Sequence, residues 1–412
     1  MDVSVEAAVA DAHRREWAFV LAATVRVAGD IDLAEECVQD AYARALTIWP
    51  ETGIPFRPNA WLTTVARRSA IDALRRRSTH DRVLPKLMER GGSTSESVDD
   101  ESDIADDRLR LIFTCCHPAL ASEAQVALTL RLLCGLTTSE VAHMFLVPES
   151  TMAARITRAK KKIAAARVPY RVPAPDELPS RIDAVLNVIH LVFTTGHTAP
   201  IGADLIRRDL VERSLNLARM LRILLPGNPD VAGLLALILL TDARSASRIT
   251  GEGTLALLAE QDRSQWNHHE INEGLCLVRE ALGHRPPGRF ALMAAIAAVH
   301  AEAPNWSATD WAELVGLYEL LAMIWPSPVV SLNRAVAVGF AYGAETGLAA
   351  LDALVDEPQL ASYGYLSAAR ANFLGRLSRF DEARVAYKEA LALTENEVEQ
   401  LFLTRQIEQL GP

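Results

Sequence analysis

Residues 138–162 read TSEVAHMFLVPESTMAARITRAKKK, which indicates a helix, a tight turn and a second helix. Pro148 marks the turn, because proline has no backbone N–H and cannot continue the first helix. Apolar residues recur at helical spacing and are expected to point inward: Val141, Met144 and Phe145 in the first helix, and Met152, Ile156, Ala159 and Ile163 in the second. The other side of the second helix is basic, so the pair suits insertion into a major groove. An ordinary helical hairpin with a solvated basic face is the alternative at this point.

The length and composition of the chain point to a helical protein with several domains. Its 412 residues predict two or three domains, and half of the residues are hydrophobic. Helical periodicities recur and alternating β-branched runs are scarce, so the predicted fold class is all-α. The net charge of −10 is divided unevenly: residues 1–168 hold 22 Lys and Arg against 23 Asp and Glu, or −1, and the remainder holds 20 against 29, or −9. Basic charge is clustered in residues 61–77, which suits a nucleic-acid partner.

Cysteine usage and the N-terminus predict a cytoplasmic location. The five cysteines are odd in number and lie in apolar helical contexts, which is typical of reduced, buried thiols. The N-terminus is charged from Asp2 onward, so we expect no signal peptide. The longest apolar run, residues 231–240, has about half the length of a membrane span, so no membrane association is predicted.

The residues do not predict an enzyme, a metal site or a cofactor. Cys115, Cys116 and Cys134 invite a zinc site, but adjacent cysteines do not easily bind one ion and no C-x-x-C pair is present. The sequence has no Gly-rich phosphate loop and no nucleophile elbow. Four charged residues of the second half suit either a ligand site or inter-helix ion pairs and caps, and we favour the pairs and caps: Asp242, Arg244, Asp262 and Arg263.

Composition divides the chain into five segments. A helical unit covers residues 8–80, an acidic linker covers 81–105, and a second helical unit with the helix-turn-helix covers 106–168. We expect the linker to be flexible, because the stretch from Thr94 to Asp107 holds seven acidic residues and no Lys or Arg. Prolines mark a stiff spacer over 169–179, and residues 180–412 are helical again.

The C-terminal segment carries a repeat signal. Seven residues match the tetratricopeptide pattern, in which small residues let two antiparallel helices pack closely: Leu374, Gly375, Phe380, Ala383, Tyr387, Ala390 and Leu391. A weaker copy at Ala353 and Leu354 precedes Ala390 and Leu391 by 37 residues (390 − 353). We therefore predict a helical-repeat region, with an irregular bundle as the alternative, above all for residues 180–330.

Two segments of the first unit have helical patterns with distinct outer faces. Residues 30–49 form an amphipathic helix whose expected outer face is Glu35, Glu36, Gln39, Asp40 and Arg44. Residues 58–77 place Trp61 ahead of paired arginines, and a stacking surface beside a cationic track suits opened single-stranded DNA. Trp61 can equally be a core aromatic.

Together with the helix-turn-helix, these segments resemble bacterial sigma factors of the extracytoplasmic-function group. The helix DLAEECVQDAYARA resembles the polymerase-binding helix of that family, AWLTTVARRSAIDALRRR its −10 reading helix, and VPESTMAARITRAK its −35 reading helix. The resemblance implies polymerase contacts by Glu35, Glu36, Gln39, Asp40 and Arg44. It implies −10 contacts by Asn59, Trp61, Thr64, Arg67, Arg68, Arg75 and Arg76. It implies −35 contacts by Ser150, Thr151, Arg155, Arg158, Lys161 and Lys162, with Lys160 as a further phosphate contact.

The remainder resembles a minority subgroup with a long helical extension of tetratricopeptide character. The matching stretches are DAR from Asp242, DRSQW from Asp262 and SPVVSLNRAV from Ser327. The chain departs from its relatives at Ala153 and Ala154, which read no donor or acceptor pattern, and at residues 194–197, which puts any shared pocket there in doubt.

The resemblance implies a sigma factor that binds core RNA polymerase and promoter DNA. It also implies that the extension regulates activity by docking on the sigma units or on a protein partner. The alternative is a helix-turn-helix regulator with a tetratricopeptide-like sensor domain that acts without sigma activity. Such a regulator has no need of the helix at 30–49.

Overall fold

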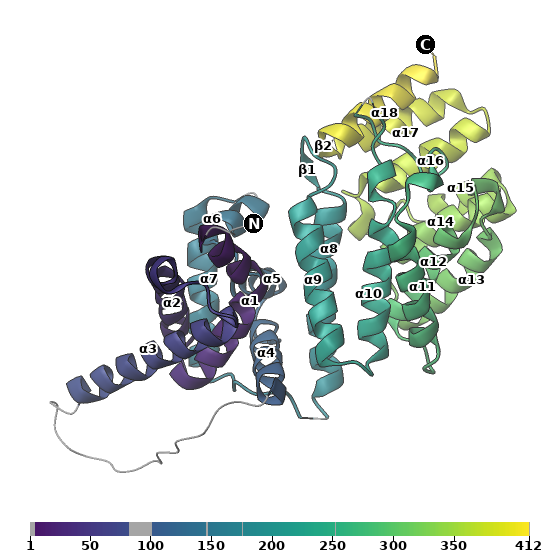
Figure 1. The fold of residues 1–412 in the computed structure, drawn as a ribbon. Helices are drawn as coiled ribbons and strands as arrows, with labels where there is room; N and C mark the ends of the chain where they lie inside the picture. Colours follow the sequence, from purple (N-terminus) through teal and green to yellow (C-terminus); the bar gives the residue numbers. More distant parts are fainter. Residues whose placement is uncertain (1–4, 82–100, 146, 175, 252, 412) are drawn as a thin grey trace. The chain divides into compact units, whose positions relative to one another are not determined.

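The chain is helical almost throughout in a computed structural model that describes residues 5–81, 101–145, 147–174, 176–251 and 253–411 (Figure 1). Two short strands, β1 (Ile201–Gly202) and β2 (Glu395–Asn396), pair in parallel. The predicted all-α class is confirmed. The chain divides into two compact units, Met1–Val188 and Ile189–Pro412, and the division falls within helix α8 (Leu178–His197).

Three helices open the first unit: α1 (Val5–Ala28), α2 (Ile31–Thr52) and α3 (Pro58–Asp81). Gly29 allows the sharp turn between α1 and α2, since its φ of 64° lies in the left-handed region. Asp30 then caps α2, because its carboxylate accepts a hydrogen bond from the Leu33 N–H at 2.7 Å. The three helices pack on one another, with Leu62, Ala66 and Ala70 forming the buried face of α3.

The remaining helices of the first unit contain the helix-turn-helix: α4 (Glu101–Cys115), α5 (Ser122–Leu128), a π-helix (Thr129–Leu133), α6 (Thr138–Met144) and α7 (Glu149–Ala165). A capping box starts α6, in which the Thr137 N–H donates to the Glu140 carboxylate at 2.6 Å and the Glu140 N–H donates to the Thr137 hydroxyl at 3.1 Å. Pro148 lies at the N-cap of α7. The predicted inner face of α7 is confirmed, because all four of its residues are buried: Met152, Ile156, Ala159 and Ile163.

The predicted acidic linker 81–105 ends earlier than expected. Residues 82–100 lie outside the described residues, and α4 already begins at Glu101. The acidic run continues into this helix, and its last residue, Asp107, is buried in the unit. Its carboxylate lies 2.8 Å from Arg110 of α4 and 3.3 Å from Arg26 of α1. Two cations therefore compensate the acidic residue that ends the predicted disordered stretch.

The two small units predicted at 8–80 and 106–168 pack together as one body. The indole N–H of Trp17 in α1 donates to the Leu132 carbonyl of the π-helix at 3.0 Å, in the buried interior. The hydroxyl of Tyr170, in the predicted spacer, donates to the Ala22 carbonyl at 3.0 Å. Arg181 of α8 donates to the Phe113 carbonyl of α4. The spacer and the start of α8 thus belong to the first unit.

The second unit is a succession of helices that follow one another in contact: α9 (Arg208–Leu224), α10 (Pro229–Asp242), α11 (His268–Leu282), α12 (Arg289–Glu302), α13 (Trp311–Ile324), α14 (Pro328–Tyr342), α15 (Ala344–Asp352), α16 (Gly364–Arg376), α17 (Phe380–Ala392) and α18 (Glu397–Gln409). The apolar run 231–240 makes α10 buried along most of its length. No helix among the described residues is long and apolar enough to cross a membrane.

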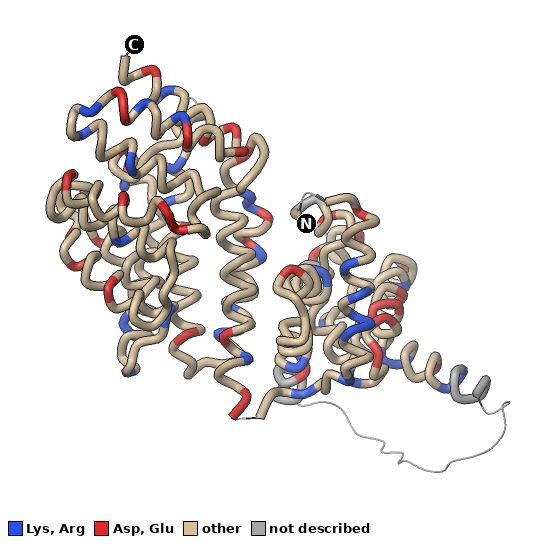
Figure 2. The backbone as a smooth tube through the Cα atoms, turned by 180° about the vertical axis from the view of Figure 1, so that it is seen from behind, with Lys and Arg blue, Asp and Glu red and all other residues tan. Residues whose placement is uncertain are grey.

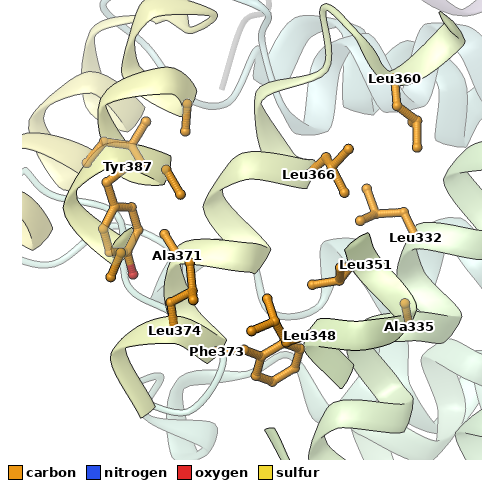
Figure 3. Close-up of a cluster of buried hydrophobic side chains, with 14 residues drawn as sticks. Leu332, Ala335, Leu348, Leu351, Leu360, Leu366, Ala371, Phe373, Leu374 and Tyr387 are labelled. Atoms are coloured by element: carbon orange, nitrogen blue, oxygen red, sulfur yellow. The ribbon is translucent and has the colours of Figure 1, made fainter. Parts of the chain in front are cut away.

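The C-terminal helices share one core, drawn in Figure 3. It joins Leu332 and Ala335 of α14 to Phe373 and Leu374 of α16, and Tyr387 of α17 packs on the same cluster. Four of the seven residues that carried the repeat signal are buried in it: Leu374, Ala383, Tyr387 and Ala390. The helical character of this region is confirmed, and its tetratricopeptide character stays a prediction.

The cysteines differ from the prediction in one case. Cys37, Cys115, Cys116 and Cys134 are buried in the first unit, but Cys276 of α11 is exposed. The buried face of α11 consists of Ile271, Gly274, Val278 and Ala281, and Cys276 lies outside this face. Among the described residues, no three side chains of the metal-binding types lie close enough to hold an ion.

Candidate nucleic-acid interface

The outer face of α7 presents most of the side chains predicted to read a −35 element. Five of them are exposed: Ser150, Thr151, Arg158, Lys161 and Lys162. The Nε atom of Arg158 donates to the Ala154 carbonyl one turn back at 3.2 Å, which holds the side chain along the helix. Ala153 and Ala154 are exposed on the same helix and leave room for a close approach.

Arg155 lies differently from the other predicted −35 residues. Its guanidinium pairs with Glu123 of α5 at 3.0 Å and lies 5.7 Å from the centre of the Phe145 ring. The side chain is only 23% exposed. Arg155 therefore ties α7 to α5 and to the turn that follows α6, so Arg158 is the more accessible of the two arginines.

The sequence analysis predicted that Lys160 contacts phosphate and so faces outward, but in the structure it faces α2. Its ammonium lies 2.6 Å from the Asp32 carboxylate and also pairs with Glu35, both in α2. Figure 2 shows basic residues along α7 beside acidic residues of α2. Although burial acts to lower the pKa of Lys160, Glu35 and Asp32 outweigh it and raise that pKa. Lys160 is charged and held within the unit.

The outer face of α2 is confirmed as exposed for four of its five predicted residues: Glu36, Gln39, Asp40 and Arg44. Glu35 is the exception, because its side chain is 6% exposed and pairs with Arg131 at 2.9 Å as well as with Lys160. The prediction placed Glu35 outside on the pattern of one helix alone. The partners that bury it come from the π-helix and α7, more than ninety positions further along the chain.

The predicted −10 helix α3 carries its cations on one side. Thr64, Arg68 and Arg75 are exposed and follow one another at helical spacing, so they form a single stripe. Arg76 is exposed beside them and Arg67 is half-buried. The stripe is exposed to solvent, and Arg75 pairs within α3 with the exposed Asp72 at 3.9 Å.

Of the aromatic residues around the start of α3, Trp49 and Trp61 pack together and Phe56 lies at the surface. Trp61 is half-buried and packs edge-on against the buried Trp49 of α2, with ring centres 5.5 Å apart. The Asn59 side-chain oxygen accepts from the Ala60 N–H at 2.9 Å, so this side chain is part of the helix start. Phe56, in the loop between α2 and α3, is fully exposed. Sequence reasoning missed Phe56, although an aromatic residue in a Pro-rich loop next to Arg57 was a visible signal.

Comparisons with known proteins match three successive segments of the chain to family models. Residues 13–80 match the family model described as Sigma-70 region 2, and residues 110–163 match Sigma-70, region 4. Residues 181–282 match a family of unknown function, DUF6596.

Relatives match over different parts of the chain. An uncharacterized protein of Rhizobium meliloti (strain 1021) is 41% identical over 395 residues, which cover 95% of this chain and 93% of that protein. A probable ECF RNA polymerase sigma factor, SigI, of two Mycobacterium tuberculosis strains is 28% identical over 178 residues, which cover 42% of this chain and 60% of that protein.

Proposed function

The chain belongs to the extracytoplasmic-function sigma factors of the sigma-70 superfamily, and from this premise we propose that α2 binds core RNA polymerase while α3 and α7 direct it to promoters. We further propose that the C-terminal extension controls this activity in the cytoplasm. A sigma factor performs no covalent chemistry. It supplies recognition and strand-opening energy to a polymerase that has no specificity of its own.

One observation carries the promoter-binding proposal: α7 buries a full apolar face and exposes Arg158, Lys161 and Lys162 on the other side. A helix held in this way after a tight turn fits the width of the major groove. Arginine can pair with a guanine edge, whereas the lysines neutralise phosphates and add affinity that falls with salt.

We propose that the −10 element is held as an opened strand along α3. Its exposed Arg68 and Arg75 offer a cationic track, and the fully exposed Phe56 at the end of the preceding loop offers a ring for stacking. Stacking of a base on an aromatic side chain contributes about 1–3 kcal/mol, which offsets part of the cost of unpairing the base.

Promoter binding then requires the first unit to open. The two elements are centred about 25 base pairs apart, or roughly 85 Å along B-DNA at 3.4 Å per pair. The contacts of Lys160 and Arg131 with Glu35 hold α7 and the π-helix against α2, which is much too close for that span. A chain of 19 residues, the number from 82 to 100, spans at most about 65 Å when fully extended. Together with the lengths of α3 and α4, which it joins, this is enough to cover the distance between the two promoter elements.

Polymerase binding tests the role of α2. We expect the double change Gln39→Ala with Asp40→Arg to weaken the complex with core RNA polymerase at least tenfold, because both side chains are exposed on the proposed contact face and the charge is reversed. Glu345→Arg makes the same charge change on exposed α15 and serves as the matched control. Equal affinity of the double variant and the control removes α2 from the interface.

Transcription tests the whole proposal. Core polymerase with the full chain is given linear templates whose −35 and −10 segments are randomised, and the transcripts are sequenced. We expect a defined pair of motifs to be enriched above core polymerase alone. Specific DNA binding without any polymerase complex would instead support the helix-turn-helix regulator that acts without sigma activity.

The extension is tested by truncation. Residues 169–412 carry −9 of the net charge of −10. This charge is opposite in sign to the outer faces of α3 and α7, which supports the proposal that the extension contacts or shields them. The cut is placed after Val188 because Tyr170 and Arg181 bond within the first unit. We expect transcription by the 1–188 fragment to differ several-fold from that of the full chain, with circular dichroism as the check of folding. Equal activity of the two proteins contradicts regulation by the extension.

A further inference from the structure

The second unit has an open cavity of about 1210 Å³ that is lined by aliphatic, aromatic and polar side chains. The rings of Trp306, Trp311, Phe340 and Phe373 form a connected surface on it. Ring centres lie 4.8 Å apart for Trp306 and Trp311, 4.6 Å for Trp311 and Phe340, and 5.5 Å for Phe340 and Phe373, which is labelled in Figure 3. Ligand cavities are commonly on the order of 300–1,000 Å³ and lined in this way, so the space suits a ring-bearing small molecule.

Arg244 and Arg248 line this cavity, Arg208 and Arg263 lie near them, and three of these four arginines have acceptors. Arg208 pairs with Asp242 at 2.8 Å, and Arg248 donates to the His197 carbonyl and the Thr198 hydroxyl. Arg263 donates to the carbonyls of His300 and Ala303, both at 2.6 Å. Each of these three cations is held by the protein itself.

Arg244 is the exception. It lines the cavity, and its guanidinium has no hydrogen-bond acceptor and no carboxylate partner within the part of the chain that the structure describes. Burial and the nearby Arg248 lower its pKa to about 10, so the group stays charged at neutral pH. The pairing expected from the sequence for this residue is therefore not formed, whereas that of Arg208 with Asp242 is.

The surroundings of Arg244 do not neutralise it. The two histidines beside it, His197 and His300, are neutral at pH 7, because burial and the neighbouring arginines lower their pKa values to about 2 and about 4. Of the two acids in the lining, Glu395 and Glu399, the second already accepts a hydrogen bond from Tyr365 and interacts with Arg248. A charged group taken from water without a partner is costly, and the cost is removed when an anion pairs with it.

We propose that this cavity binds a small aromatic organic acid, whose acidic group pairs with the guanidinium of Arg244 and whose ring lies on the aromatic wall. Two other arginines line the cavity: Arg248 is held by its acceptors, and Arg376 is exposed with its guanidinium 4.8 Å from the centre of the Phe340 ring. Arg244 is therefore the one partly buried lining cation without an acceptor among the described residues, which favours a monoanion over a polyphosphate. The apolar wall favours a compact ring over a peptide, because the N–H and C=O groups of a peptide need partners that aromatic rings do not supply.

Two fluorescent probes separate the acid from the ring. The anion 8-anilinonaphthalene-1-sulfonate and the neutral N-phenyl-1-naphthylamine share the same rings, and only the first carries an acidic group. Both are titrated into the full chain without polymerase or DNA, so the result does not depend on the proposed sigma activity. We expect one sulfonate per chain with an affinity at least tenfold weaker in Arg244→Gln, and neutral-probe binding that changes less than twofold.

Two further variants complete the test. Arg334→Gln makes the same charge change at an exposed position of α14 outside the cavity lining, and we expect it to bind both probes as the wild type does. Phe340→Leu removes a ring from the wall and should weaken both probes alike. Equal sulfonate affinity in Arg244→Gln and wild type, or no binding at a ratio of one to one, overturns the proposal.

Stability gives an independent readout. Arg244→Met removes the partly buried charge at similar volume, so we expect an unfolding temperature at or above that of the wild type in the absence of probe. A clear loss of stability shows that Arg244 has a partner within the protein, which contradicts a site that waits for an anion.

Discussion

The ammonium of Lys160 lies between two carboxylates of α2, and one of them, Glu35, is almost fully buried. Glu35 also meets Arg131, so a single carboxylate joins three helical segments of the first unit. Loss of one partner leaves the others with charge that the interior does not compensate.

We therefore expect Lys160→Ala to lower the free energy of unfolding of the first unit by about 1–3 kcal/mol. Lys161→Ala, one position further along and exposed, should change it by less than about 0.5 kcal/mol. Urea denaturation measures both. A Lys160→Ala protein as stable as Lys161→Ala would show that the contact with α2 contributes nothing to the closed unit.

Arg158 and Lys162 have different expected roles in promoter binding. Arg158→Ala should cost about 1–3 kcal/mol on the preferred promoter and much less on others, if its guanidinium pairs with a base edge. Lys162→Ala should weaken binding to all sequences alike and reduce the dependence on salt. Binding of the holoenzyme to preferred and scrambled promoters at several salt concentrations distinguishes them. The same sequence-independent loss in both variants makes Arg158 a phosphate contact.

At the scale of single helices, close packing of α10 on α12 depends on Gly233. A Cβ atom at this position would lie 2.6 Å from the Ala291 nitrogen and 2.8 Å from the Phe290 carbonyl carbon, both backbone atoms that cannot rotate away. Gly316 of α13 offers the opposite case, since a Cβ atom there meets nothing within 4 Å.

Gly233→Ala should lower the free energy of unfolding by about 1–3 kcal/mol, because the two helices must separate. Gly316→Ala should raise it by about 0.5–1 kcal/mol, because alanine loses less backbone entropy in a helix than glycine. Urea denaturation compares the two. If both changes act in the same direction, the close approach of α10 and α12 does not decide the effect.

Elements were predictable from the sequence where the pattern is local. The inner face of α7 and the exposed face formed by Glu36, Gln39 and Asp40 follow from helical spacing alone. Glu35, Arg155 and Lys160 were misplaced or only partly described, because their partners come from other helices. The repeat pattern located the core of α16 and α17. It gave no sign that the cavity beside these helices also contains Arg244, which lies more than a hundred positions earlier in the chain.

At the scale of the whole molecule, the second unit is expected to be sensitive to acid. Burial is the largest cause that lowers the pKa values of three of its histidines: His190 and His300 to about 4, and His197 to about 2. In the unfolded chain each has a pKa near 6.5, so the unfolded state binds more protons below that pH. Their stabilising contribution is complete above about pH 6.5 and is lost as the pH falls toward 4.

The expected loss is about 1.4 kcal/mol per pH unit for each histidine. His190→Gln removes one of them, so between pH 7.5 and 5.0 this variant should lose about 2 kcal/mol less than the wild type. Urea denaturation at the two values measures the difference. An equal loss in both proteins assigns the acid sensitivity to other groups.

The distribution of cysteines allows opening of the first unit to be followed by thiol labelling. At neutral pH the exposed Cys276 is open to a maleimide, whereas burial raises the pKa values of Cys37, Cys115 and Cys116 and keeps these thiols protonated and covered. All four covered sulfurs lie in the first unit and the accessible one in the second. A mass spectrum of the native protein should therefore show one label at once, and each later label reports how often the first unit uncovers its interior. Polymerase and promoter DNA can be added to the same reaction, so the opening that we propose for promoter binding can be followed as a labelling rate in the unaltered chain.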